Sequence, residues 1–198
     1  TDSLSSNSLM WSTLIRSMLI YGIDRRTLAA MTQLIDVPAG LNGVVAADTA
    51  IGAVDGDRGF FHYGPFDATV LARTRSFEDV WFLVRNGRLP DPDEAAAFRT
   101  ETAALRSIPA DLATVIDTVG RMEASMLSKL RSVLSVAAGP LGLSPVIDVS
   151  DTDRRVQTLR LAALVPSILA ALYRVGSGQR PVEADPTLGH AAAYLHQT

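Results

Sequence analysis

The chain has 198 residues, of which 47% are hydrophobic, 20% charged and 6% aromatic, and its formal net charge is −3. This length can bury one sizeable core, and the abundance of Ala and Leu, which are strong helix formers, predicts an all-α fold. The low net charge and the lack of any basic cluster exclude a nucleic-acid-binding class. The absence of cysteine excludes disulfides and thiolate metal sites.

We interpret residues 1–35 as an N-terminal extension or arm, and residues 36–198 as one helical region. Met31 would make a natural translation start, so residues 1–30 are interpreted as an extension or a non-native addition. The apolar run from Leu9 to Tyr21 is too short to span a bilayer and is interrupted by Arg16, so we expect no membrane partner.

Residues 40–66 differ from the rest of the chain and predict a small β-hairpin. The stretch from Leu41 to Ile51 indicates an extended segment, and residues 55–59 (Asp-Gly-Asp-Arg-Gly) supply a turn. Residues 60–63 (Phe-Phe-His-Tyr) are expected to form the partner strand. We therefore interpret His62 as a structural residue.

Residues 67–198 carry the caps and stops of a series of helices. Ser76 with Asp79 resembles a capping box, and Gly87 is expected to stop the helix that they begin. Trp81 on this helix is expected to be buried in the core. Caps and Pro or Gly stops predict further helices over residues 91–107, 110–120 and 123–138.

The last third of the chain predicts a central helix and a short final one. Apolar residues cover most of the circumference of a helix from Asp151 to about Val175, so it should be central, and Pro166 is expected to kink it. A final helix is predicted to open at Asp185 and to carry His190 near its start. An imidazole and free backbone N–H groups at a helix N-terminus suit a carboxylate.

Each of the three histidines of the chain also has a purely structural interpretation. From the pattern alone, His190 is more typical of a core histidine bonded to a backbone carbonyl. We interpret His196 as a helix-surface or interface residue. Because His62, His190 and His196 lack the spacing of metal ligands, we expect no metal. Arg180, just before the final helix, could add positive charge, but no motif assigns it a role.

The order of these motifs resembles the citrate synthase family over residues 40–195. The hairpin region resembles the N-terminal hairpin of that family, and residues 76–90 (Ser-Phe-Glu-Asp-Val-Trp-Phe-Leu-Val-Arg-Asn-Gly-Arg-Leu-Pro) resemble its Phe-Glu-x-Val helix followed by Gly-x-Leu-Pro. Residues 165–174, 178–181 and 190–195 complete the series. The resemblance implies a multi-helix, large-domain portion of an all-α fold with a small N-terminal β-hairpin.

The family condenses an acyl-CoA with a 2-oxo acid, so the resemblance implies an acyltransferase that joins acetyl-CoA or propionyl-CoA to oxaloacetate. Acyl-CoA would be a cosubstrate, with no bound cofactor. His190 matches the histidine that contacts oxaloacetate, which implies a substrate-binding role. The resemblance further implies a cytoplasmic homodimer of the tricarboxylic acid cycle, and the alanine and arginine bias indicates a GC-rich bacterial genome.

No catalytic residue is assigned within this chain. Two further histidines and an aspartate perform the chemistry of the family, and the resemblance places them beyond Thr198. The chain is therefore interpreted as the N-terminal part of an enzyme with a missing C-terminal half. Departures from the motifs, such as residues 63–66 (Tyr-Gly-Pro-Phe), leave a divergent paralogue or a methylcitrate synthase open. The alternative is a non-catalytic, truncated paralogue that dimerises as a binding or regulatory module.

Overall fold

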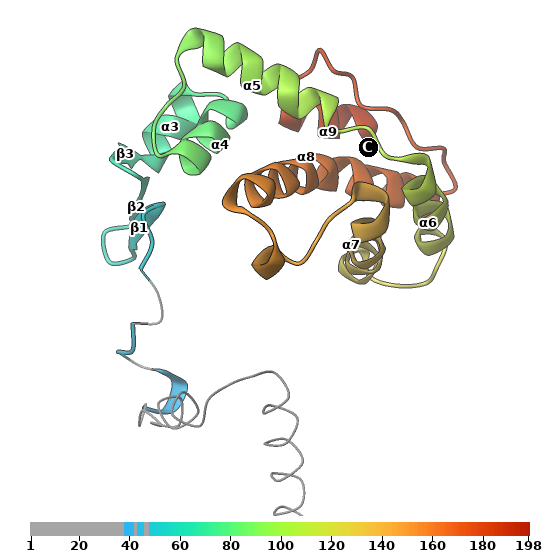
Figure 1. Ribbon diagram of the computed structural model, residues 1–198, viewed down its shortest axis with the longest axis horizontal. Coiled ribbons are helices and arrows are strands. Elements are labelled where there is room, and N and C mark those ends of the chain that lie inside the picture. The colour runs from blue at the N-terminus through green and yellow to red at the C-terminus, as the bar shows by residue number, and fades with distance from the viewer. Residues whose placement is uncertain (1–37, 42, 46–47) are drawn as a thin grey trace, which may run out of the picture. The chain divides into compact units, whose positions relative to one another are not determined.

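The computed structural model describes residues 38–41, 43–45 and 48–198 (Figure 1). Its contacts divide the chain into two units, Thr1–Asp48 and Thr49–Thr198. The described part of the first unit includes a single 3₁₀ turn, η1 (Ala39–Leu41). The interpretation of residues 1–35 as an arm lies outside the described residues and stays a prediction.

A small antiparallel sheet opens the second unit, with strands in the order β1-β2-β3. The predicted turn and the aromatic strand are confirmed, but the first strand is Gly52–Asp55 and not the stretch that ends at Ile51. A Cβ on Gly52 would overlap the carbonyl oxygen of His62, so the close pairing requires glycine there. His62 Nδ1 bonds the carbonyl oxygen of Gly64, which supports its structural interpretation. The strands are β1 (Gly52–Asp55), β2 (Phe60–Tyr63) and β3 (Phe66–Asp67).

Helices make up the rest of the unit, so the all-α class with a small N-terminal sheet is confirmed. The predicted capping box of Ser76 and Asp79 is present, and Gly87 ends that helix in the left-handed conformation with φ 74°. The helices are α3 (Ala68–Thr74), α4 (Phe77–Asn86), α5 (Pro92–Ala104), α6 (Ala110–Gly120), α7 (Met126–Leu141), η2 (Val146–Asp148), α8 (Asp151–Gly176) and α9 (His190–Gln197).

Several helix ends differ from the prediction, and α7 also begins at Met126, after its N-cap Ser125, and not at residue 123. Helix α5 ends at Ala104, before the predicted end at residue 107. Helix α7 continues through Pro140 and ends at Leu141, not at residue 138. The left-handed conformation of the following Gly142 lets its N–H and that of Leu143 bond the last carbonyls. The proline costs α7 only one hydrogen bond in its last turn, and that loss does not end the helix.

The start of the final helix also differs from the prediction. Helix α9 begins at His190 and not at Asp185. The carboxylate of Asp185 instead accepts hydrogen bonds from the backbone N–H and the hydroxyl of Thr187, which closes a turn. This local competition for the aspartate explains why the predicted cap does not begin a helix.

The predicted central position of α8 is confirmed, because α8 packs against α5, α6, α7 and α9 (Figure 1). Where α6 crosses α8 the helices approach closely, because a Cβ on Gly120 would lie only 2.6 Å from Cγ1 of Val175. Helix α8 is continuous across Pro166, and the predicted kink stays a prediction. The buried core of these helices is aliphatic and comprises Leu112, Ile116, Val133, Ala137, Leu141, Leu164, Ile168, Ala171 and Leu172.

Two stretches of the described chain are apolar and long enough to cross a membrane, residues 126–148 and 151–176. The first is not one continuous α-helix, because α7 ends at Leu141 and η2 follows Pro145. The second is α8, whose apolar side chains fill the core. Burial in the core accounts for part of the composition of α8, whereas little of the first stretch is buried.

Candidate functional site

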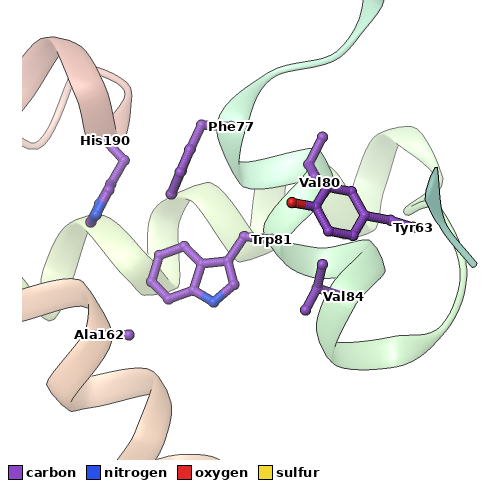
Figure 2. A pocket seen from close by; sticks show the side chains of 7 residues that line it. All are labelled: Tyr63, Phe77, Val80, Trp81, Val84, Ala162 and His190. Atoms are coloured by element: carbon purple, nitrogen blue, oxygen red, sulfur yellow. The ribbon is translucent and has the colours of Figure 1, made fainter. Parts of the chain in front are cut away.

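His190 is the first residue of α9 and is only 7% exposed. Its ring stacks on Phe77 with ring centroids 5.1 Å apart and planes within 6° of parallel. Trp81, one turn further along α4, approaches the same ring at 5.2 Å (Figure 2). The aromatic face of α4 therefore fixes the orientation of the imidazole.

A buried ion pair lies beside this stack. The Glu78 carboxylate on α4 accepts a hydrogen bond of 2.6 Å from the backbone N–H of His190, and Arg106 lies 3.6 Å from the same carboxylate oxygen. Arg106 also donates to the carbonyl of Leu188 at 2.7 Å. The two charged side chains are 5% and 3% exposed. A charge buried this deeply requires a partner, and each of these two supplies it for the other.

This arrangement corrects the physical basis of the sequence prediction. We expected free N–H groups at the start of the last helix, but the first of them already bonds the chain's own carboxylate, Glu78. The negative charge that a helix N-terminus favours is thus supplied internally. The expected contact between the His190 side chain and oxaloacetate stays a prediction.

The surroundings of His190 favour the neutral form of its imidazole. Burial lowers its pKa below the ordinary value, the nearby Arg106 charge lowers it further, and Glu78 opposes the shift. The buried Nδ1 has no hydrogen-bond partner among the described residues. An unpaired lone pair costs less than an unpaired N–H, so we assign the proton to Nε2.

A surface cavity of about 310 Å³ borders the His190 ring (Figure 2). Its walls come from β2, α4, α8 and α9, and none of the side chains that line it is charged. Trp81 was expected in the core, but it is only half-buried because one face lines this cavity. The lining residues are Tyr63, Phe77, Val80, Trp81, Val84, Ala162 and His190.

The other candidates lie elsewhere. His196 is exposed on α9, in agreement with the prediction of a surface residue. Arg180 is exposed and does not line the cavity; its carbonyl accepts a 2.6 Å hydrogen bond from Arg174. Across the described residues, no group of three His, Asp or Glu side chains could hold a metal ion.

Sequence reasoning missed Glu78 and Arg106, the two residues that organise this site. Glu78 looked like an ordinary acidic residue in the first turn of a capped helix. Arg106 follows the end of α5 in a segment without a motif. A buried pair joining positions 28 residues apart leaves no periodic signal, so only the tertiary structure reveals it.

A comparison with sequence models of protein families shows to which family the chain belongs. The family model described as "Citrate synthase, C-terminal domain" matches residues 40–198. The chain belongs to the citrate synthase family. The resemblance inferred from the motifs is therefore confirmed.

Individual citrate and 2-methylcitrate synthases are also similar to this chain in sequence. The citrate synthase of Haloferax volcanii is 33% identical over 162 residues, which are 81% of this chain and 43% of the relative. A 2-methylcitrate synthase of Mycobacterium tuberculosis is 30% identical, over 81% of this chain and 40% of the relative. The citrate/2-methylcitrate synthase of Bacillus subtilis is 27% identical, over 79% and 41%.

Solved citrate synthases share the fold. That of Pyrobaculum aerophilum matches with a TM-score of 0.70 and 23% identity, over 83% of this chain and 46% of that chain. That of Thermoplasma acidophilum, in ternary complex with carboxymethyl coenzyme A and oxaloacetate, matches with a TM-score of 0.70 and 21% identity, over 82% and 42%. The chain thus spans less than half the length of these citrate synthases, and its assignment to their N-terminal part stays a prediction.

Proposed function

We propose that this chain forms part of an acyltransferase that condenses acetyl-CoA or propionyl-CoA with oxaloacetate. The family match over residues 40–198 carries the proposal. The relatives include both citrate and 2-methylcitrate synthases, which is why both acyl groups are retained. The Thermoplasma acidophilum relative, solved with a coenzyme A derivative and oxaloacetate, supports the two substrates.

In the proposed reaction a carboxylate base removes a proton from the acyl methyl group, and the resulting enol attacks the oxo carbon of oxaloacetate. A new carbon–carbon bond forms, and water then cleaves the thioester to release the CoA thiol. The described residues do not bring two histidines together with a carboxylate. His62 is on β2, His190 lines the cavity at the start of α9, and His196 is exposed near the end of α9. These groups are therefore expected from the rest of the protein.

The contribution of this chain is a frame of packed helices. Helix α8 supplies the core, and the Glu78–Arg106 pair joins α9 to α4. We include in the proposal a homodimer, supported by exposed apolar side chains around a second groove of about 570 Å³ between α7, α8 and α9. Action in the cytoplasm, within the tricarboxylic acid cycle of a bacterium, is proposed from the family resemblance alone.

The test is oxaloacetate-dependent thiol release from acetyl-CoA and propionyl-CoA. We expect turnover from the complete reading frame, and none from the 198-residue chain of confirmed intact mass. Turnover by the chain alone would overturn the conclusion that catalytic groups lie elsewhere. No turnover by the complete reading frame would contradict the proposed activity and leave the non-catalytic, regulatory module as the better hypothesis.

A further inference from the structure

We propose that Glu78 and Arg106 are positioning residues, which hold His190 in the place from which its imidazole meets oxaloacetate. This inference rests on the proposed function and on the substrate contact predicted for His190. Neither side chain of the pair is open to a substrate, since Glu78 is 5% and Arg106 3% exposed. The pair acts instead through the backbone of the segment that leads into α9.

Two hydrogen bonds from the pair hold this backbone on both sides of Gly189. Arg106 Nη1 donates to the carbonyl oxygen of Leu188 at 2.7 Å, and Glu78 Oε1 accepts from the backbone N–H of His190 at 2.6 Å. Arg106 Nη2 lies 3.6 Å from the same Oε1, so the two bonds belong to one network. Between the two bonded backbone groups, the soft torsions are φ and ψ of Gly189.

The residue between the two bonds does not restrict the backbone by itself. Gly189 has φ −62° and ψ 162°. Glycine can adopt many other conformations because it has no Cβ. The restriction on the path of the chain into His190 therefore comes from the Glu78–Arg106 pair.

The imidazole is oriented by the same helix that carries Glu78. Phe77 and Trp81 contact the His190 ring with centroid distances of 5.1 and 5.2 Å, and Glu78 lies between them in the α4 sequence (Figure 2). Helix α4 thus places both the backbone and the ring of His190. A misplacement of about 1 Å can lower the activity of a catalytic site about 100-fold, so this placement matters for a substrate contact.

The test variant combines Glu78→Gln with Arg106→Met in the complete reading frame. It removes the bond to Leu188 and both charges together, so no buried charge is left without a partner. We expect the KM for oxaloacetate to rise about tenfold, while the KM for the acyl-CoA stays unchanged. Arg106→Lys is a milder second variant, because it keeps the charge but lacks the fork that holds two partners, and it should raise the same KM by a smaller factor.

Two control variants separate positioning from stability. Gly120→Ala overpacks the contact between α6 and α8 without touching the junction, so it should lower stability and leave both KM values unchanged. Asp117→Asn removes an exposed ion pair with Arg121 and should change neither property. An equal rise in the oxaloacetate KM of Gly120→Ala would show that loss of stability, and not positioning, is responsible.

Proton NMR of the 198-residue chain tests the positioning without any turnover. The ring currents of Phe77 and Trp81 should separate the ring protons of His190 from those of the exposed His196. We expect the double variant to move the His190 resonances part of the way toward those of His196, and Gly120→Ala to leave them in place. His190→Phe assigns the resonances, and circular dichroism establishes that each variant is folded.

Two results would overturn the proposal. One is unchanged His190 resonances in the folded double variant and in Arg106→Lys. The other is an unchanged KM for oxaloacetate in these variants when the complete reading frame is active. If the wild-type reading frame releases no thiol, the proposed function fails by itself, and the NMR comparison still decides whether the pair positions His190.

Discussion

The helix packing around α8 and the junction between α4 and α9 bury side chains of opposite chemistry. The α6–α7–α8 region is held by aliphatic contacts such as those of Leu112, Ile168 and Leu172. At the α4–α9 junction, Glu78 and Arg106 are buried together beside His190. The clustered core side chains of the first region are all apolar, with Lys129 donating one buried hydrogen bond to the Gly120 carbonyl beside them, whereas the second depends on three specific polar contacts.

The two regions therefore contribute differently to the fold: aliphatic packing stabilises it, and the polar junction orients α9. Aliphatic burial stabilises in proportion to the area removed from water and tolerates many arrangements of similar volume. A buried ion pair adds little net stability, but an arrangement that leaves one partner alone is strongly penalised. We infer that the aliphatic core around α8 stabilises the unit and that the Glu78–Arg106 pair determines where α9 begins.

The largest effect should come from breaking the junction. Replacing Glu78 by Ala leaves Arg106 buried without its counter-charge and removes the acceptor for His190 N–H, so we expect a loss of about 4 kcal/mol in the free energy of unfolding, measured in urea. The double variant Glu78→Gln with Arg106→Met should recover part of the loss. Asp117→Asn, in an exposed ion pair with Arg121, should have no measurable effect. A similar small effect from Glu78→Ala would contradict the comparison.

The next largest effect should come from adding one methyl group where α6 packs against α8. Gly120→Ala places a Cβ 2.6 Å from Val175 Cγ1, and overpacking of this kind costs about 2 kcal/mol. The matched control is Gly139→Ala on α7, where a Cβ meets nothing within 4 Å and should stabilise the helix slightly. Thermal unfolding of both variants checks the prediction, and equal shifts would show that the α6–α8 approach is not close.

A smaller effect is expected at the start of α4, which carries the junction residues. Ser76→Ala removes the side-chain oxygen that accepts from Asp79 N–H and should cost about 1 kcal/mol. Ser76→Thr keeps that oxygen and should be close to the wild type in urea unfolding. If both variants lose the same stability, the capping box does not contribute.

The smallest expected effect is the pH dependence at His190. Because the folded pKa is lowered, the unfolded chain binds more protons below its ordinary value of 6.5, so stability is present above that pH and is lost as pH falls toward the folded pKa. The melting temperature of His190→Phe should therefore fall less between pH 7.5 and 5.5 than that of the wild type. His196→Gln, at an exposed position, should retain the wild-type dependence.

Local sequence signals predicted the helices around this site better than the site itself. The capping residues Ser76 and Asp91 and the stop at Gly87 act within one turn, and the structure contains all three. Asp185 carried a similar local signal, but its carboxylate serves a turn with Thr187 and the helix begins at His190. A residue able to cap a helix can bond any nearby N–H, so its presence predicts a turn or a helix equally well.

The all-α class, the central position of α8, the capped helices and the family were predictable from the sequence, because each depends on composition, periodicity or the order of short motifs. The surroundings of His190 could be seen only in the folded structure. Its N–H meets Glu78, 112 residues away, and its ring faces an uncharged cavity. Such contacts arise when α9 packs onto α4, and no pattern along the chain encodes that distance.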